Sequence, residues 1–214
     1  MSEFMDIITS DNLSYKQKVL HLAQAAENSE HPIKTTAEFD RLFAAHALDD
    51  MCEGNAPYRP RYICPDYQVF AQNGSEFLRF DKPETLDDLL WGLAALYDNV
   101  PSVTSRPVYV GQLDKIIDPF LEGMTDAEIK PRLRRFLNHI DRTVASGYCH
   151  ANIGPEDTRA GRLLLEVDRE LMNAVPNFTL KYDPEVTSAE FMRLAVKTTL
   201  VCSTPAFATH RIHK

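Results

Sequence analysis

Apolar side chains recur at intervals of three and four residues along most of this chain, which is the pattern of amphipathic helices. Between residues 126 and 145, for example, Ile129, Leu133 and Phe136 fall on one face of a helix. The pattern therefore predicts a mainly helical protein. The predicted helices are Tyr15–Glu27, Ala37–Met51, Thr85–Asp98, Asp126–Ala145, Thr158–Ala174 and Ser188–Cys202.

Several of these helices begin with the capping-box pattern, in which Ser or Thr is followed three residues later by Glu or Gln. The two side chains bind backbone N–H groups that the first turn of a helix leaves unpaired. The pairs are Ser14 with Gln17, Thr35 with Glu38, Thr125 with Glu128 and Thr187 with Glu190. Gly54 and Pro205 follow two of the predicted helices and can end them.

One segment has the composition of a β-strand. Residues Pro176–Pro184 read PNFTLKYDP, a β-branched and aromatic run with a proline at each end. The backbone groups of such a strand must pair with neighbouring strands. No other segment has a comparably strong strand signal. We therefore expect most of the sheet that this strand joins to lie outside this polypeptide.

Irregular stretches between the helices carry unusual chemistry. Residues 55–67 read NAPYRPRYICPDY and alternate Arg59 and Arg61 with tyrosines. This stretch is either an extended arm that packs across helices or a surface that binds an acidic neighbour. Residues 100–112 can be partly extended and carry Arg106, which is either an anion contact in a pocket or part of a structural salt bridge.

A third stretch, residues 147–157, reads GYCHANIGPED. It holds Cys149 next to His150, but adjacent side chains rarely meet in the geometry of a catalytic pair. A nucleophilic role for Cys149 is therefore not favoured. His150 and Asn152 lie two residues apart and share a face if the stretch is extended. They form either a polar pocket wall or a loop in which the histidine is simply hydrogen-bonded.

The charge of the chain disfavours nucleic-acid binding. The chain has 23 basic and 31 acidic residues, which give a formal net charge of −8 at pH 7. Nucleic-acid-binding proteins usually present a net basic face. A local basic cluster, Lys130, Arg132, Arg134 and Arg135, lies on the predicted helix of residues 126–145. The cluster is either a solvated face or a contact for a phosphate or a partner.

Other common functions lack their sequence signals. The chain has no glycine-rich phosphate-binding motif, and its seven histidines include neither H-E-x-x-H nor an i, i+4 pair. No uncharged apolar run approaches the roughly 18 residues that span a bilayer, and the N-terminus lacks the pattern of a signal peptide. The four cysteines are widely spaced and are expected to be reduced thiols. We expect a cytoplasmic protein that binds no metal, nucleic acid or membrane.

Four segments together resemble the N-terminal portion of the YjjI-type glycine radical enzymes, which are relatives of pyruvate formate-lyase and anaerobic ribonucleotide reductase. The similarity runs in order from about residue 48 to about residue 205 without large gaps, and several matches in order are more specific than any one of them. The segments are DMCEGNAPYRPRYICPDYQVFAQNGSEFL (50–78), VPSVTSRPVYVGQLD (100–114), HANIGPED (150–157) and PNFTLKYDPEVT (176–187).

The resemblance implies an α/β fold, mainly helical in this chain. The family fold is a ten-stranded barrel that is built from two antiparallel half-barrels and wrapped in helices, and this chain corresponds to its N-terminal part. Residues 1–50 are then an N-terminal helical segment, and residues 51–214 are the start of an incomplete barrel domain.

The resemblance also implies a chemistry. In this family a thiyl radical on a loop cysteine abstracts hydrogen from the substrate, and a glycyl radical on a C-terminal loop generates that thiyl radical. A separate iron–sulfur, S-adenosylmethionine-dependent activase installs the glycyl radical under anaerobic conditions. Both loops are expected beyond the last helix predicted here. We therefore expect no catalytic residue in this chain, a structural role for Cys202, and no activity without the missing C-terminal half or a homo-oligomeric partner.

If residues of this chain touch the small polar substrate, Arg106 is expected to bind an anion. The other candidates, which supply hydrogen bonds or pocket shape, are Tyr109, His150, Asn152 and Thr179. Three alternatives remain open. The chain is a non-catalytic fragment that docks with a separately encoded C-terminal half, or an inert remnant, or a small helical enzyme that uses Cys149 and His150.

Overall fold

The computed structural model describes residues 3–29, 35–48, 66–76, 79–103, 108–143 and 149–210. The chain divides into two compact units. One contains residues 1–63 and 102–106, and the other contains residues 64–101 and 107–214. The domain boundary expected at residue 50 falls outside the described residues.

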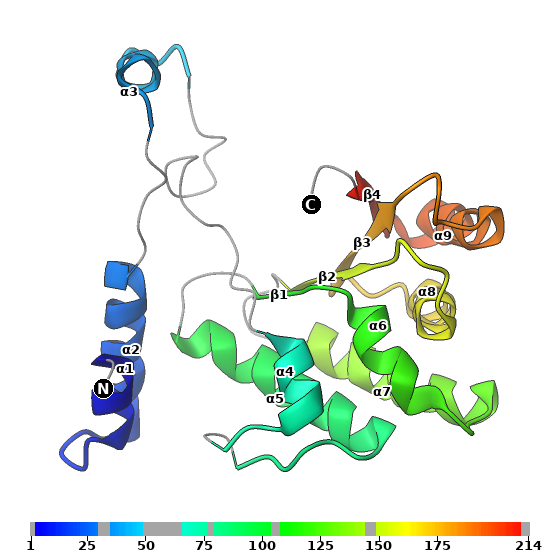
Figure 1. Ribbon diagram of the computed structural model, residues 1–214, viewed down its shortest axis with the longest axis horizontal. Coiled ribbons are helices and arrows are strands. Elements are labelled where there is room, and N and C mark those ends of the chain that lie inside the picture. The colour runs from blue at the N-terminus through cyan, green and yellow to red at the C-terminus, as the bar shows by residue number, and fades with distance from the viewer. Residues whose placement is uncertain are drawn as a thin grey trace. The chain divides into compact units, whose positions relative to one another are not determined.

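The first unit contains the helices α1 (Glu3–Thr9), α2 (Tyr15–Ser29) and α3 (Ala37–Ala44) (Figure 1). The capping box at α2 is confirmed, because the Ser14 N–H donates to Gln17 Oε1 at 2.9 Å. At α3 the N-cap is Thr36 rather than the predicted Thr35, and Thr36 Oγ1 accepts from the Phe39 N–H.

The predicted extension of α3 to Met51 is wrong, because the helix ends at Ala44. His46 adopts a left-handed conformation with φ 53°. The Ala47 N–H then donates to the Leu42 carbonyl at 2.9 Å. This is the geometry of a Schellman motif, which terminates a helix by binding its last carbonyl groups.

The second unit alternates helices with strands. Its helices are α4 (Tyr67–Asn73), α5 (Leu86–Val103), α6 (Leu113–Ile117), the 3₁₀ helix η1 (Asp118–Leu121), α7 (Asp126–Thr143), α8 (Arg159–Leu171) and α9 (Ala189–Cys202). Its strands are β1 (Val108–Val110), β2 (Cys149–Ile153), β3 (Asn177–Tyr182) and β4 (Ala206–Thr209). The long helices predicted from the sequence are confirmed, although α9 is capped by Ser188 and not by Thr187. Thr187 instead donates its hydroxyl to the Pro155 carbonyl at 2.9 Å.

The predicted strand at Pro176–Pro184 is confirmed as β3. The expectation that most of its sheet lies outside this polypeptide is wrong for the strands beside it, because both strands that pair with β3 belong to this chain. β3 pairs with β2 on one side and with β4 on the other, and β2 also pairs with β1. All of these pairs are parallel, and the strand order is β1-β2-β3-β4. The chain therefore builds its own four-stranded parallel sheet.

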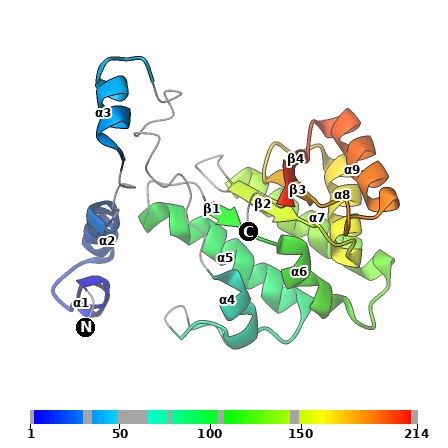
Figure 2. The ribbon, with the colours of Figure 1, turned by 45° about the horizontal axis from the view of Figure 1, so that its top comes forward.

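The helices that connect the strands lie on the same face of the sheet. Parallel neighbours need crossover connections, and crossovers of one hand between strands in sequence order place their helices on one side. Figures 1 and 2 show α5, α6, α7, α8 and α9 on that side. Their buried apolar side chains form one core with alternate residues of the strands, including Val108, Ile153 and Phe178.

The basic cluster of α7 binds acidic residues of the same chain. Lys130 Nζ lies 2.7 Å from Glu166 of α8, and Arg132 Nε lies 2.9 Å from Asp87 of α5. Arg134 likewise pairs with Glu170 of α8. The cluster therefore joins α7 to both neighbouring helices. Its side chains stay partly exposed, Arg135 to 74%, which supports the solvated face of the two alternatives drawn from the sequence.

Candidate functional site

The second face of the sheet is polar, and we call it the polar face. Successive side chains of a strand point to opposite sides, and residues in register on neighbouring strands point to the same side. His150 is in register with Tyr109 and with Asn177, and Asn152 is in register with Thr179. The polar face is made of Tyr109, His150, Asn152, Asn177, Thr179 and Lys181.

The fold brings four of the predicted site residues together. Tyr109, His150, Asn152 and Thr179 come from three different strands, and the register places all of them on the polar face. The expectation that His150 and Asn152 share a face is confirmed, because residues 149–153 form a strand. Arg106 lies outside the described residues, as do Arg59 and Arg61.

Cys149 lies on the opposite face from His150. It is fully buried among the apolar residues of the core, and this burial raises the pKa of the Cys149 thiol to about 11. A thiol in that environment is a poor source of thiolate. Cys149 and His150 therefore point to opposite faces of the sheet. This supports the expectation that they do not form a nucleophilic pair.

Cys202 is the last residue of α9, as predicted. Its Sγ donates to the Thr198 carbonyl at 3.3 Å and lies 3.7 Å from the Asp168 carboxylate. Asp168 also accepts a 2.6 Å hydrogen bond from Thr204, which follows the helix. The Cys202 thiol therefore belongs to a cluster that holds the turn between α9 and β4.

His150 is half-buried on the polar face, and desolvation lowers the pKa of its imidazole. The ring is therefore neutral at pH 7 and can both donate and accept a hydrogen bond. Behind it, the hydroxyl of Tyr97 on α5 donates to the His150 carbonyl at 3.3 Å. A neutral imidazole suits contact with an uncharged or hydrogen-bonding ligand group.

Asp114 is a buried carboxylate that the sequence analysis missed. It lies on α6, just after β1, and is fully buried. Its Oδ2 accepts from the Gly154 N–H at 3.1 Å and from the Thr158 hydroxyl at 2.9 Å, which joins the loop after β1 to the loop after β2. Among the residues that the structure describes, its buried Oδ1 has no hydrogen-bond partner. Desolvation is the largest cause of a pKa that is raised from 3.8 to about 6.

The raised pKa of Asp114 predicts a pH-dependent stability. The folded protein favours the protonated carboxyl of Asp114 over the ionised one. The stability that this preference contributes is fully present below pH 3.8 and is lost as the pH rises through about 6. Asp114→Asn keeps an oxygen that can accept from Gly154 but does not ionise. We therefore compare the unfolding free energy of the variant with that of wild type at two pH values. We expect the difference, variant minus wild type, to be about 1 kcal/mol larger at pH 7.5 than at pH 5.

Urea denaturation of both proteins at the two pH values measures this difference. The comparison of variant with wild type cancels the titration of the other groups. A difference in unfolding free energy that is the same at pH 5 and pH 7.5 would contradict a raised pKa for Asp114.

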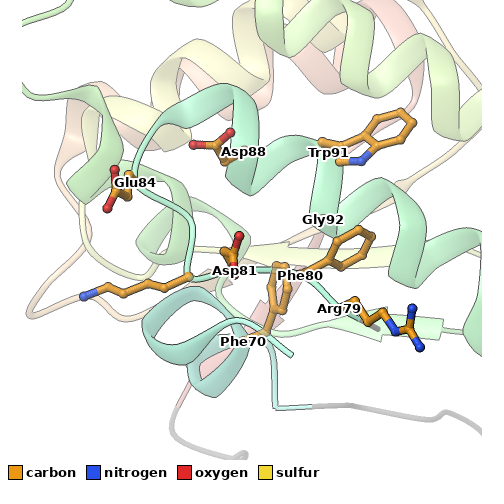
Figure 3. Close-up of a pocket in the computed structure, with 9 residues that line it drawn as sticks. Phe70, Arg79, Phe80, Asp81, Glu84, Asp88, Trp91 and Gly92 are labelled. Atoms are coloured by element: carbon orange, nitrogen blue, oxygen red, sulfur yellow. The ribbon is translucent and has the colours of Figure 1, made fainter. Parts of the chain in front are cut away.

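A separate hollow of about 540 Å³ lies at α4 and the first half of α5. Phe70 and Phe80, which line it, meet edge to face with ring centroids 6.3 Å apart. Figure 3 shows Glu84 and Arg79 at opposite ends of this hollow, so these charges do not converge on one point. Asp88 is engaged in the capping box of α5, where its Oδ2 accepts from the Thr85 hydroxyl at 2.7 Å. The hollow contains none of the predicted site residues.

The described residues contain no group of three or more His, Cys, Asp or Glu side chains that could hold a metal ion. None of the helices in the described ranges is long and apolar enough to cross a membrane.

Comparison with known proteins gives consistent matches. A family model described as "Glycyl radical enzyme YjjI-like" matches residues 13–214. An uncharacterized protein of Haemophilus influenzae is 45% identical over 211 residues, which cover 97% of this chain and 41% of that protein. The uncharacterized protein YjjI of Escherichia coli K12 is 44% identical over 207 residues, which cover 97% of this chain and 40% of that protein. The chain therefore spans about two fifths of the length of these relatives.

Proposed function

This chain belongs to the YjjI-like glycyl radical enzyme family, and on that premise we propose that it forms part of the barrel wall of an enzyme that performs anaerobic radical chemistry on a small polar substrate. In this proposal the polar face of the sheet lines the substrate pocket. The helices α5 to α9 form part of the outer layer of the barrel.

The observation that carries the proposal is the topology of the sheet. Four parallel strands follow one another in sequence order, and their helices lie on one face. Barrels of parallel strands and helices have this arrangement, with the helices outside and the opposite face of the strands turned inward. Four parallel strands fit within one half of a barrel that is made of two antiparallel halves. A face that carries Tyr109, His150 and Thr179 offers hydrogen-bonding groups to a substrate.

We propose that the radical-bearing residues lie outside the described residues. Cys149 points into the helical core, away from the polar face, and Cys202 is engaged in the turn after α9. Neither thiol is placed to meet a substrate on the polar face. A glycyl radical that a separate S-adenosylmethionine-dependent activase installs would supply the hydrogen-abstracting chemistry, and the residues of this chain would bind and orient the substrate.

A second candidate function, assembly with a separate C-terminal portion, is favoured by the outer side of α9. In the second unit, α7 packs on α8 and α8 packs on α9. The outer side of α9 carries the exposed apolar residues Val196, Leu200 and Val201, and Leu200 is 81% exposed. Phe207 of β4, on the helix-covered face of the sheet, is also exposed. We propose that a further strand and helix, from the rest of a family member, cover this surface.

The proposed function is tested with a hybrid in which this chain replaces the matching portion of the Escherichia coli relative. The hybrid and the intact relative are expressed anaerobically in Escherichia coli and examined by electron paramagnetic resonance. We expect the doublet of a glycyl radical from both proteins. A folded hybrid without a radical, next to a relative that has one, would contradict the function proposed for this chain. Absence of a radical from both would contradict radical chemistry in these proteins.

Assembly is tested by co-expressing this chain and the remainder of the relative as two separate polypeptides. If the surface of α9 and β4 binds the remainder, the two polypeptides co-purify and yield a radical, as the hybrid does. A radical from the hybrid alone, with no co-purification of the separate polypeptides, would overturn the assembly proposal.

A further inference from the structure

Asn152 is unlike the other residues of the polar face, because it is 0% exposed. Both ends of its side-chain amide have partners. The backbone N–H of Gln112 donates to Asn152 Oδ1, and Asn152 Nδ2 donates to the hydroxyl oxygen of Tyr109 at 2.5 Å. Tyr109 belongs to β1 and Gln112 to the turn after it, so this amide joins β2 to β1 and its turn.

The backbone partner determines which way the amide points. A backbone N–H can only donate a hydrogen bond, so the atom that faces Gln112 must be the amide oxygen of Asn152. The atom that faces Tyr109 is then the NH₂ group, which can only donate. The Tyr109 oxygen is therefore an acceptor toward Asn152, and the hydrogen of the Tyr109 hydroxyl is directed to a third group.

The turn that Asn152 holds is conformationally unusual. Gln112 has a left-handed backbone with φ 55° and directly precedes α6. Its side chain also accepts a hydrogen bond from Gln68 Nε2 of α4 at 3.4 Å. An apolar residue at position 152 would leave the Gln112 N–H without this acceptor, and an aspartate would have no hydrogen to give to Tyr109. Asparagine supplies both an acceptor and a donor at this buried position.

We propose that Asn152 is a positioning residue, which does not touch the ligand itself but holds the Tyr109 hydroxyl as a hydrogen-bond donor on the polar face. A ligand group that receives the Tyr109 hydroxyl hydrogen in place of that third group is then an acceptor oxygen, such as that of a carbonyl, a carboxylate or a hydroxyl. This ligand assignment rests on the proposed function of the polar face as the pocket wall. The hydrogen-bond orientation does not, and it is tested in the absence of any ligand.

The first test is nuclear magnetic resonance of the side-chain amide of Asn152 in the full chain at pH 7. In Tyr109→Phe the acceptor oxygen is lost and the ring is kept. We expect a shift of one Asn152 amide proton and exchange with water that is several-fold faster. Tyr182→Phe is the matched control, because it removes a phenolic oxygen from the other face of β3. Asn152 amide signals that are equally unaffected by both variants would overturn the proposal.

The second test is the titration of Tyr109, followed through carbon-13 at the Cζ position of the tyrosines. The chain has eight tyrosines, and the signal that is missing in Tyr109→Phe identifies Tyr109. In Asn152→Asp the donated hydrogen bond is replaced by a carboxylate, so we expect the pKa of Tyr109 to rise by about one unit or more. Asn177→Asp adds the same charge to the same face one strand further away, and we expect a smaller rise.

A Tyr109 pKa that is unchanged or lower in Asn152→Asp would contradict the donor role of Asn152. If Asn152→Asp does not fold, the amide measurement in Tyr109→Phe still decides the question. Neither test involves a radical, so failure of this proposal and failure of the proposed enzyme function give different results.

Discussion

Replacing Phe178 by alanine is expected to lower the free energy of unfolding by about 3–5 kcal/mol. Phe178 is 1% exposed on β3, which has a paired strand on each side. Its ring points into the core between the sheet and the helices. Alanine would remove most of that buried apolar volume and leave a cavity, in a protein whose total stability is expected to be about 5–15 kcal/mol.

Phe207 provides the matched control for this prediction. It is the same residue type on the neighbouring strand, but it is 42% exposed. We expect Phe207→Ala to cost less than about 1 kcal/mol in the isolated chain. Chemical denaturation of wild type and both variants measures the two losses. Similar small losses in unfolding free energy would mean that β3 is not the buried strand of a sheet within this chain.

Gly154→Ala is expected to cost about 3 kcal/mol of unfolding free energy. Gly154 follows β2 and has φ 76°, a conformation that disfavours residues with a Cβ atom. A Cβ at this position would also lie 2.9 Å from the Lys181 carbonyl oxygen of β3. The cost therefore has two sources, the backbone conformation and the close approach of the neighbouring strand.

Gly123→Ala separates these two sources. Gly123 has φ 74°, almost the same as Gly154, but a Cβ there would meet no atom within 4 Å. We expect this variant to lose about 1 kcal/mol, the cost of the backbone conformation alone. Thermal denaturation of the two variants side by side tests the difference. Equal losses would contradict the close packing of the loop after β2 against β3.

Local signals were sufficient to predict the long helices. The capping boxes predicted at Ser14 and Thr125 involve residues three apart, and their hydrogen bonds are present. Where two adjacent hydroxyl residues compete, as Thr187 and Ser188 do, the spacing does not decide between them. Ser188 is the cap because Thr187 binds the carbonyl of Pro155, a contact between distant parts of the chain.

The remaining strands could not be recognised from local pattern. β1 has three residues, and β2 reads CHANI, which has little β-branched or aromatic character. β4 reads AFAT and lies directly after Pro205. These segments are strands because each pairs with a neighbour that is distant along the chain, and such pairing leaves no periodic trace in three to five residues.

The candidate site was predictable only in part. The two-residue spacing of His150 and Asn152 indicated a shared face, whereas Tyr109 and Thr179 were named from the family resemblance. The register that places them beside His150 and Asn152 is a long-range property of the sheet. Asp114 was missed because its burial depends on Gly154 and Thr158, which are about forty residues away in sequence.

The most direct test of the central claim is a crystal structure of the hybrid of this chain with the remainder of the Escherichia coli relative. We expect β1 to β4 to form one continuous part of a closed barrel, with Tyr109, His150 and Thr179 on the wall of its internal cavity. Side chains at these positions that are covered by helices, or that point to solvent outside a barrel formed without this sheet, would contradict the role proposed for the polar face.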